Sequence, residues 1–267
     1  MSHTISADPE SFRSFFEGWL SEQNQHLQHL TNMASEHNQA NPESLRALVE
    51  QEVKHYESYY KAKSKWAEHD VLAMLSPPWR SSLEDAFLWI GGFRPSTAFH
   101  LLYAKSGLQL EDQLAEMMRG FNTITDLSDL SQSQLAMVDK LQRGAIKQEN
   151  DISHKMAKLQ DTVADTTMVE LSHSHATIDM VRNNDHEGGD DDGHENLVES
   201  ALASKKKALE EILNRADEFR LRTIKNIMHI LTPIQGVHFL IAASELHLKL
   251  HDWGIKMDTS GQPNGDR

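Results

Sequence analysis

Apolar residues recur every three or four positions along almost the whole chain, which is the spacing of one face of an α-helix. The first such face, apolar except for one glutamine, comprises Phe12, Phe15, Phe16, Trp19, Gln23, Leu27, Leu30 and Ala34. It follows Asp8-Pro9, and the next stripe follows Asn41-Pro42, both typical of a helix start. The second helix should end at Ser76-Pro77-Pro78, because proline disfavours a helical conformation of the residue before it.

The pattern is more broken in the next forty or so residues, where short helices are expected. Ser81 and Glu84 have the spacing of a capping box, which predicts a helix start. The uninterrupted apolar run 86–90 predicts that this helix is buried on most sides, and Gly91-Gly92 should end it. Pro95-Ser96 should open another short helix that ends at Gly107, with a further helix over residues 109–119.

A long amphipathic helix is predicted after Ser131 and Gln134, which again have capping-box spacing. Its apolar face comprises Leu135, Val138, Leu141, Ala145, Ile152, Met156, Leu159 and Val163. This face could pair within the domain or between two chains. The acidic, glycine-rich stretch 183–196 has no apolar residue and is expected to be a disordered loop. Its partial likeness to an EF-hand loop fails at the first position, Gly188, so no metal site is expected.

The helical pattern then resumes and continues almost to the end of the chain. The next stripe comprises Val198, Leu202, Leu209, Ile212, Leu213, Ala216, Phe219, Thr223, Ile224, Ile227 and Ile230. Thr232, Pro233 and Gln235 combine an N-cap, a first-position proline and a third-position glutamine. The last helix should run to Trp253 and end at Gly254, leaving residues 255–267 as a disordered tail. The prediction is an all-α protein in which residues 10–254 form one bundle-like domain of about eight helices, with long antiparallel amphipathic helices.

Composition narrows the function classes. The formal net charge is −14, from 26 Lys and Arg against 40 Asp and Glu, which argues against unaided binding to nucleic acid or to an anionic membrane. The chain has no cysteine, so disulfides and thiol chemistry are excluded. Neither a signal peptide nor an apolar run of membrane-spanning length is apparent. We expect an intracellular protein of the nucleus and cytoplasm.

Three segments together resemble a plant family. They are Phe15-Phe16-Glu17-Gly18-Trp19-Leu20, the stretch 78–96 that contains Trp89-Ile90-Gly91-Gly92-Phe93-Arg94-Pro95-Ser96, and Leu231-Thr232-Pro233-Ile234-Gln235-Gly236 with its continuation to Gly254. These motifs resemble the Delay-of-Germination domain, which also forms the C-terminal part of plant TGA-type bZIP transcription factors. The resemblance implies an all-helical domain, roles in seed dormancy, seed maturation and abscisic-acid responses, and binding of clade A type 2C protein phosphatases.

One difference from TGA factors bears on DNA binding. Those factors carry a basic region and a leucine zipper ahead of the shared domain, whereas residues 1–10 contain neither Lys nor Arg. We therefore expect no direct DNA-binding module. The alternative to a phosphatase-binding regulator is a transcriptional co-regulator that reaches DNA only through a TGA-type partner, and self-association also stays open.

His247 and His251 are the sharpest candidates for chemistry. They lie four residues apart on a predicted helix, so both imidazoles leave one face and could ligate a metal or haem iron. His238 falls at a similar angular position, with apolar residues between. The resemblance favours haem, because haem binding is associated with this C-terminal helix in dormancy proteins. With 16 histidines in the chain, pairs at this spacing also arise by chance.

Two further motifs have alternative interpretations. Phe12, Phe15, Phe16 and Trp19 either belong to the core or form a surface for a helix-in-groove contact with a phosphatase. The group Trp89, Gly91, Gly92, Arg94 and Pro95 is expected to be structural.

In that group, Arg94 would bond C-terminal carbonyls of a neighbouring helix or pair with a buried carboxylate such as Glu84 or Asp85, the alternative being a ligand-binding arginine. The sequence contains neither Gly-x-Ser-x-Gly nor His-Glu-x-x-His, nor the set of kinase motifs. We therefore expect a regulatory protein rather than an enzyme.

Overall fold

The computed structural model describes residues 9–35, 41–118, 127–173 and 191–260. These residues are helical nearly throughout and form no β-strand, which confirms the all-α prediction. The elements are α1 (Pro9–Ser35), α2 (Pro42–Ala67), α3 (Val71–Leu75), α4 (Ser82–Ala86), α5 (Thr97–Met118), η1 (Leu127–Asp129), α6 (Gln132–Asp161), η2 (Thr162–Ala164), α8 (Asp191–Ile230) and α9 (Pro233–Ser260). Residues 166–173 are also helical.

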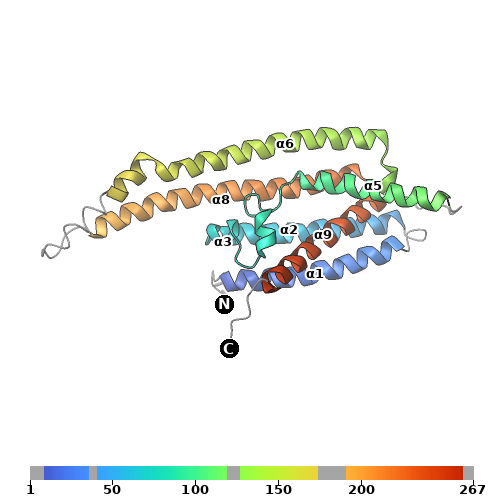
Figure 1. Cartoon of the computed structure of the whole chain (residues 1–267), viewed down its shortest axis with the longest axis horizontal. Coiled ribbons are helices and arrows are strands. Elements are labelled where there is room, and N and C mark those ends of the chain that lie inside the picture. The colour runs from blue at the N-terminus through green and yellow to red at the C-terminus, as the bar shows by residue number, and fades with distance from the viewer. Residues whose placement is uncertain (1–8, 36–40, 119–126, 174–190, 261–267) are drawn as a thin grey trace, which may run out of the picture.

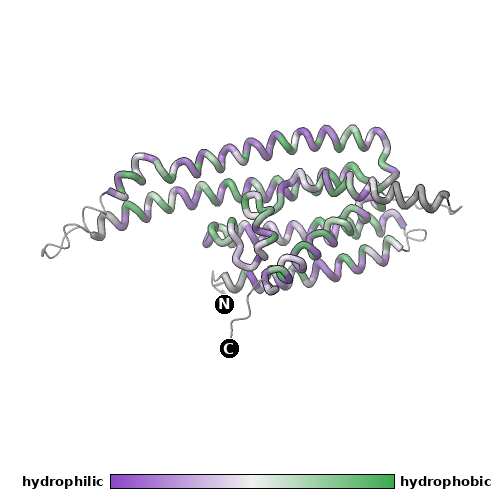
Figure 2. The backbone as a smooth tube through the Cα atoms, in the orientation of Figure 1, coloured by the Kyte–Doolittle hydropathy of each residue, from purple (hydrophilic) through white to green (hydrophobic). Residues whose placement is uncertain are grey.

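The long helices lie side by side (Figure 1). α6 and α8 form an antiparallel pair that extends past the other helices at one end of the molecule. α2 packs against α8, and α9 crosses α1 and α2 on the side away from α6. Hydrophobic and hydrophilic residues alternate along each helix at short intervals, so each helix presents an apolar stripe to its neighbours (Figure 2). In the described ranges, every helix is too short or too polar to cross a membrane.

Local capping chemistry fixes the predicted helix starts. The Asn41 side chain accepts from the Glu43 N–H at 3.0 Å. Both predicted capping boxes are present, one at Ser81 and one at Ser131. The Thr232 N–H donates to the Gln235 side chain at 2.9 Å, at the start of α9. Each of these caps satisfies backbone N–H groups that the first helical turn leaves unpaired.

Helix ends were predicted less well between residues 67 and 118. α2 ends at Ala67, before the predicted Ser76, because Asp70 starts α3 by accepting from the Ala73 N–H at 3.0 Å. The buried helix predicted over 86–90 was wrong, since α4 stops at Ala86 and the chain enters a tight turn. The two short helices predicted after Pro95-Ser96 are one helix, α5. It passes through Gly107 at an exposed position, where glycine costs a helix only about 1 kcal/mol.

Two predictions of disorder also need correction. α8 begins at Asp191, so residues 191–196 of the expected loop are helical, whereas residues 183–190 lie outside the described part of the chain. Acidic residues favour a helix N-terminus through the helix dipole. α9 continues through Gly254 to Ser260, while residues 261–267 lie outside the described part. Gly254 is needed for close packing, because a Cβ there would lie 2.0 Å from the Ser81 hydroxyl oxygen.

Candidate functional site

A tight turn at residues 89–92 lies at the centre of the molecule. Trp89 and Gly92 form an isolated antiparallel bridge, and the two residues between them, Ile90 and Gly91, have φ of 49° and 67°. Two successive positive φ values are typical of two-residue type I′ turns, which favour glycine. Ile90 therefore occupies a conformation that a β-branched residue rarely adopts.

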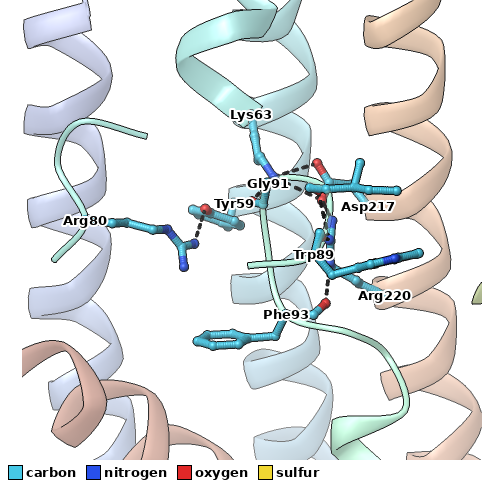
Figure 3. A network of polar contacts seen from close by, with 9 residues as sticks. Tyr59, Lys63, Arg80, Trp89, Gly91, Phe93, Asp217 and Arg220 are labelled. Carbon is cyan, nitrogen blue, oxygen red and sulfur yellow. Dashed lines mark hydrogen bonds and ion pairs between the residues drawn. The ribbon is translucent and has the colours of Figure 1, made fainter. Parts of the chain in front are cut away.

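Three buried charged side chains hold this turn in place (Figure 3). From α8, Arg220 donates to the Phe93 carbonyl at 2.7 Å, to the Ile90 carbonyl at 2.9 Å and to the Trp89 carbonyl. From α2, Lys63 donates to the Gly91 carbonyl at 2.7 Å. Asp217 pairs with both cations, at 3.1 Å from the Lys63 ammonium. Burial lowers the pKa of Lys63 to about 8, although Asp217 opposes this effect.

A cavity of about 650 Å³ opens beside the turn. Its walls come from α1, α2, α8, α9, the start of α5, Arg80, and residues 86–88 and 91–95. Most of the lining side chains are apolar or aromatic, among them Trp19, Phe87, Phe93, Phe239 and Leu246. This size and character match those of small-molecule binding sites.

Arg80 is the most unusual polar residue of the cavity wall. Its side chain is 4% exposed and lies above the rings of Phe16 and Phe93, at 5.8 Å from each centroid. It donates to the Tyr59 hydroxyl at 3.4 Å, and its Nη1 lies 3.9 Å from the Glu84 carboxylate. Its Nε and Nη1 are buried without a hydrogen-bond partner in the described residues, which is rare for a guanidinium.

The two candidate histidines of α9 have different environments. His247 lines the cavity between Trp19 and Phe93, with ring centroids 5.6 and 6.3 Å away. Burial, and secondarily the nearby Arg80 charge, lower its pKa to about 4, so its imidazole is neutral at pH 7. Its Nε2 is buried and makes no hydrogen bond within the described part of the chain. A neutral imidazole with a free ring nitrogen is the form that ligates metals.

His251 is bonded instead of free. Its Nδ1 lies 2.9 Å from the Glu84 carboxylate, and its ring packs edge-on against Phe16. Burial raises the pKa of Glu84, but hydrogen bonds from His251 and Ser81 outweigh this effect and bring that pKa to about 2. His251 is not among the residues that line the cavity, so the predicted pair does not converge on one ligand position.

The aromatic residues of α1 lie in the core. Phe12, Phe16 and Trp19 are at most 3% exposed, while Phe15 is half-buried. Their rings contact Tyr59 of α2. Of the two interpretations of this face, the core one applies to the three buried residues, so a partner would have to contact the outer face of α1.

The motif residues after the turn also differ from expectation in one respect. Arg94 pairs with a buried carboxylate, as predicted, but the carboxylate is that of Glu149 on α6, at 3.7 Å, and not that of Glu84 or Asp85; its guanidinium also lies over the Trp89 ring. Arg220 makes the carbonyl contacts instead, because its side chain reaches the turn from the buried face of α8. Arg94 is half exposed and lines the cavity, so a ligand contact stays a prediction.

Lys63, Asp217 and Arg220 were missed by the sequence analysis. They fall on the apolar faces of their helices, since Lys63 follows Tyr60 by three residues and Asp217 follows Leu213 by four. Charged residues at core positions are the signal that could have found them. Their pairing was not accessible, because 154 residues separate Lys63 from Asp217 in the chain.

Comparisons with known proteins bear out the resemblance. The family described as "DOG1: Seed dormancy control" matches residues 26–104. Protein DOG1-like 3 of Arabidopsis thaliana is 30% identical over 242 residues, which cover 88% of this chain and 81% of that protein. Protein RESPONSE TO ABA AND SALT 1 of Arabidopsis thaliana is 27% identical over 94% of this chain and 97% of its own length.

A transcription factor is also similar. Transcription factor TGA1 of Arabidopsis thaliana is 29% identical over 93% of this chain, but the match covers only 56% of TGA1. The shared unit therefore includes nearly all the helices that surround the cavity and the 89–92 turn. Because the likeness to DOG1-like 3 reaches 30% identity along most of both proteins, the chain belongs to the DOG1 family of seed dormancy proteins.

Proposed function

We propose that this protein is a non-enzymatic regulator of seed dormancy, seed maturation and abscisic-acid signalling that acts by binding type 2C protein phosphatases. The observation that carries the proposal is the match to DOG1-like 3 over 88% of the chain. The name of RESPONSE TO ABA AND SALT 1, whose match spans 97% of its length, supports the hormone connection.

The outer face of α1 is the proposed contact surface. Its inner face is occupied by the core, whereas Ser14, Glu17, Gly18 and Ser21 are exposed. A Cβ at Gly18 would have nothing within 4 Å, so a partner can approach the helix backbone closely there. A large side chain at this position would block a partner without disturbing the fold.

This surface is tested by a binding measurement with a purified clade A type 2C phosphatase. We expect Gly18→Arg to weaken binding at least tenfold. The matched control is Gly144→Arg on α6, where a Cβ also meets nothing within 4 Å. Equal binding by both variants and the wild type would refute the role of α1, and absence of binding by the wild type would refute the phosphatase proposal.

Haem is proposed as a modulator, with His247 as the residue that would hold its iron. The support is the buried, unpartnered Nε2 of His247 on the wall of the cavity, and the neutral state of that imidazole. Haem would supply a ligand-sensitive iron centre. Titration should give a Soret band that is lost in His247→Ala and retained in His251→Ala. If both variants keep the Soret band, neither histidine holds the iron and this site is refuted.

A transcriptional role is the second candidate, favoured by the match to TGA1 over 93% of this chain. In this alternative the protein acts in the nucleus and reaches DNA only through a TGA-type bZIP partner. Co-purification from seed extract distinguishes the two, since recovery of a TGA factor without a phosphatase would favour the second candidate.

A further inference from the structure

The cavity beside the 89–92 turn combines an apolar wall with an excess of positive charge. The charged residues that line it are all cations, namely Lys63, Arg80, Arg94 and Arg220. Among the described residues, these cations pair with the carboxylates of Asp217, Glu84 and Glu149, which do not line the cavity themselves. Lys63 and Arg220 share one carboxylate, so these ion pairs contain one more cation than carboxylates, and Asp85 also acts electrostatically on Arg80.

Of these four cations, Arg80 has the weakest ion pairing. Asp217 lies within 3.2 Å of Lys63 and contacts Arg220, whereas the Glu84 carboxylate is 3.9 Å from Arg80 and is already bonded by Ser81 and His251. The Nε and Nη1 of Arg80 are buried and make no hydrogen bond in the described part of the chain. A buried polar group left without a partner destabilises the fold, and a charged one does so more strongly. A guanidinium with unsatisfied donors is a receptor for a carboxylate, because hydrogen bonds between two charged groups are the strong ones.

The rest of the wall determines what the carboxylate would be attached to. Trp19, Phe93 and Phe239 are aromatic, and Leu246 and Leu250 add aliphatic surface. Phe87 and Leu246 are 62% and 50% exposed, which places apolar side chains where the cavity meets solvent. A free inorganic anion would gain nothing from such a wall, whereas an apolar body would be removed from water by it.

We propose that this cavity binds a small amphipathic monocarboxylate, with the carboxylate on Arg80 and the apolar body against the aromatic and aliphatic wall. A single carboxylate would supply a hydrogen-bond acceptor that Arg80 lacks. The size of the cavity fits a ligand of drug-like dimensions. The site differs from the proposed haem site in its receptor, which is Arg80 and not His247.

The test compares carboxylates with neutral isosteres by calorimetry on the full chain. 1-Naphthoate is paired with 1-naphthamide, and dodecanoate with dodecanol, so that one pair represents ring acids and the other acyl chains. We expect the carboxylate of at least one pair to bind at least tenfold more tightly than its neutral partner. The carboxylate that binds more tightly then shows whether the natural ligand is a ring acid or an acyl chain. Equal affinity within both pairs, or no binding by either, would overturn the proposal without any variant.

Variants locate the site. Arg80→Met should weaken carboxylate binding at least tenfold and leave the neutral isostere unchanged, while Ala243→Trp should block both by filling the cavity. Arg143→Met is the matched control, because Arg143 is exposed on α6 and pairs only with Asp139 at 2.9 Å among the described residues. His247→Ala should retain the carboxylate, which separates this site from the haem proposal. Unchanged binding by a folded Arg80→Met protein, checked by circular dichroism, would overturn the assignment.

Discussion

Replacement of Gly91 by alanine should destabilise the fold strongly. Gly91 has a φ of 67°, in the left-handed region that favours glycine. A Cβ at this position would lie 2.5 Å from the Met74 carbonyl oxygen, 3.0 Å from Leu213 Cδ1 and 3.2 Å from Lys63 Nζ. The first of these atoms belongs to the backbone, so it cannot move aside as the end of a flexible side chain can.

The magnitude follows from three contributions. The left-handed conformation costs a non-glycine residue about 1–2 kcal/mol. Overpacking against a backbone carbonyl in a well-packed interior adds about 1–3 kcal/mol. Alanine restricts the unfolded chain, which offsets about 0.4–1 kcal/mol. The free energy of unfolding should therefore fall by about 1–5 kcal/mol.

Urea unfolding followed by far-UV circular dichroism measures this change. Gly144→Ala is the matched control, because Gly144 lies within α6 with nothing within 4 Å of its Cβ position. That substitution should stabilise the protein by about 1 kcal/mol, since alanine favours helix more than glycine does. A loss below about 1 kcal/mol for Gly91→Ala would show that the turn is not held as tightly as these contacts indicate.

Three further changes test the core and its charges. Asp217→Asn leaves two buried cations without a carboxylate and should cost about 3–5 kcal/mol in urea unfolding; a loss below about 1 kcal/mol would contradict the pairing. The pKa of His247 falls from 6.5 to about 4 on folding. Its neutral imidazole therefore contributes about 3 kcal/mol to the free energy of unfolding above pH 6.5, and this contribution is lost as the pH falls towards 4. In His247→Phe, the free energy of unfolding should fall less steeply with decreasing pH than in the wild type. Part of the slope should remain, because the pKa of His55 is also lowered to about 4. An unchanged slope would refute this. Phe16→Ala should cost about 3–5 kcal/mol in the same assay, whereas Phe87→Ala, at a 62% exposed site, should change it by less than about 0.5 kcal/mol.

Helix starts were predictable from the sequence because their chemistry is local. At Asn41, Ser81, Ser131 and Thr232, the cap and the backbone it satisfies lie within three residues of each other. Such contacts form in almost any tertiary setting, so the side-chain type and spacing are sufficient evidence.

Helix ends and the cavity were less predictable because their causes lie far away in the chain. Gly107 and Gly254 look alike as potential stops, yet both are helical, and only Gly254 is fixed by contact with Ser81 of another element. The apolar run 86–90 looks like a buried helix, but its last two residues enter the 89–92 turn, where Arg220 binds the Ile90 carbonyl and Lys63 binds the Gly91 carbonyl. Periodicity shows which residues are buried and not which distant residues meet there.

The cavity and the proposed partner surface meet at adjacent residues of α1, and this links the two proposals. Trp19 lines the cavity, whereas its neighbour Gly18 lies on the exposed face of α1. A ligand that contacts the Trp19 ring can shift α1 only if it binds one position of that helix more tightly than another. Such coupling is reciprocal, so a carboxylate that changes phosphatase affinity by some factor must have its own affinity changed by the same factor. Phosphatase titrations with and without saturating 1-naphthoate, and the converse pair, should give equal ratios; a ratio of one in both directions would show that the cavity and α1 act independently.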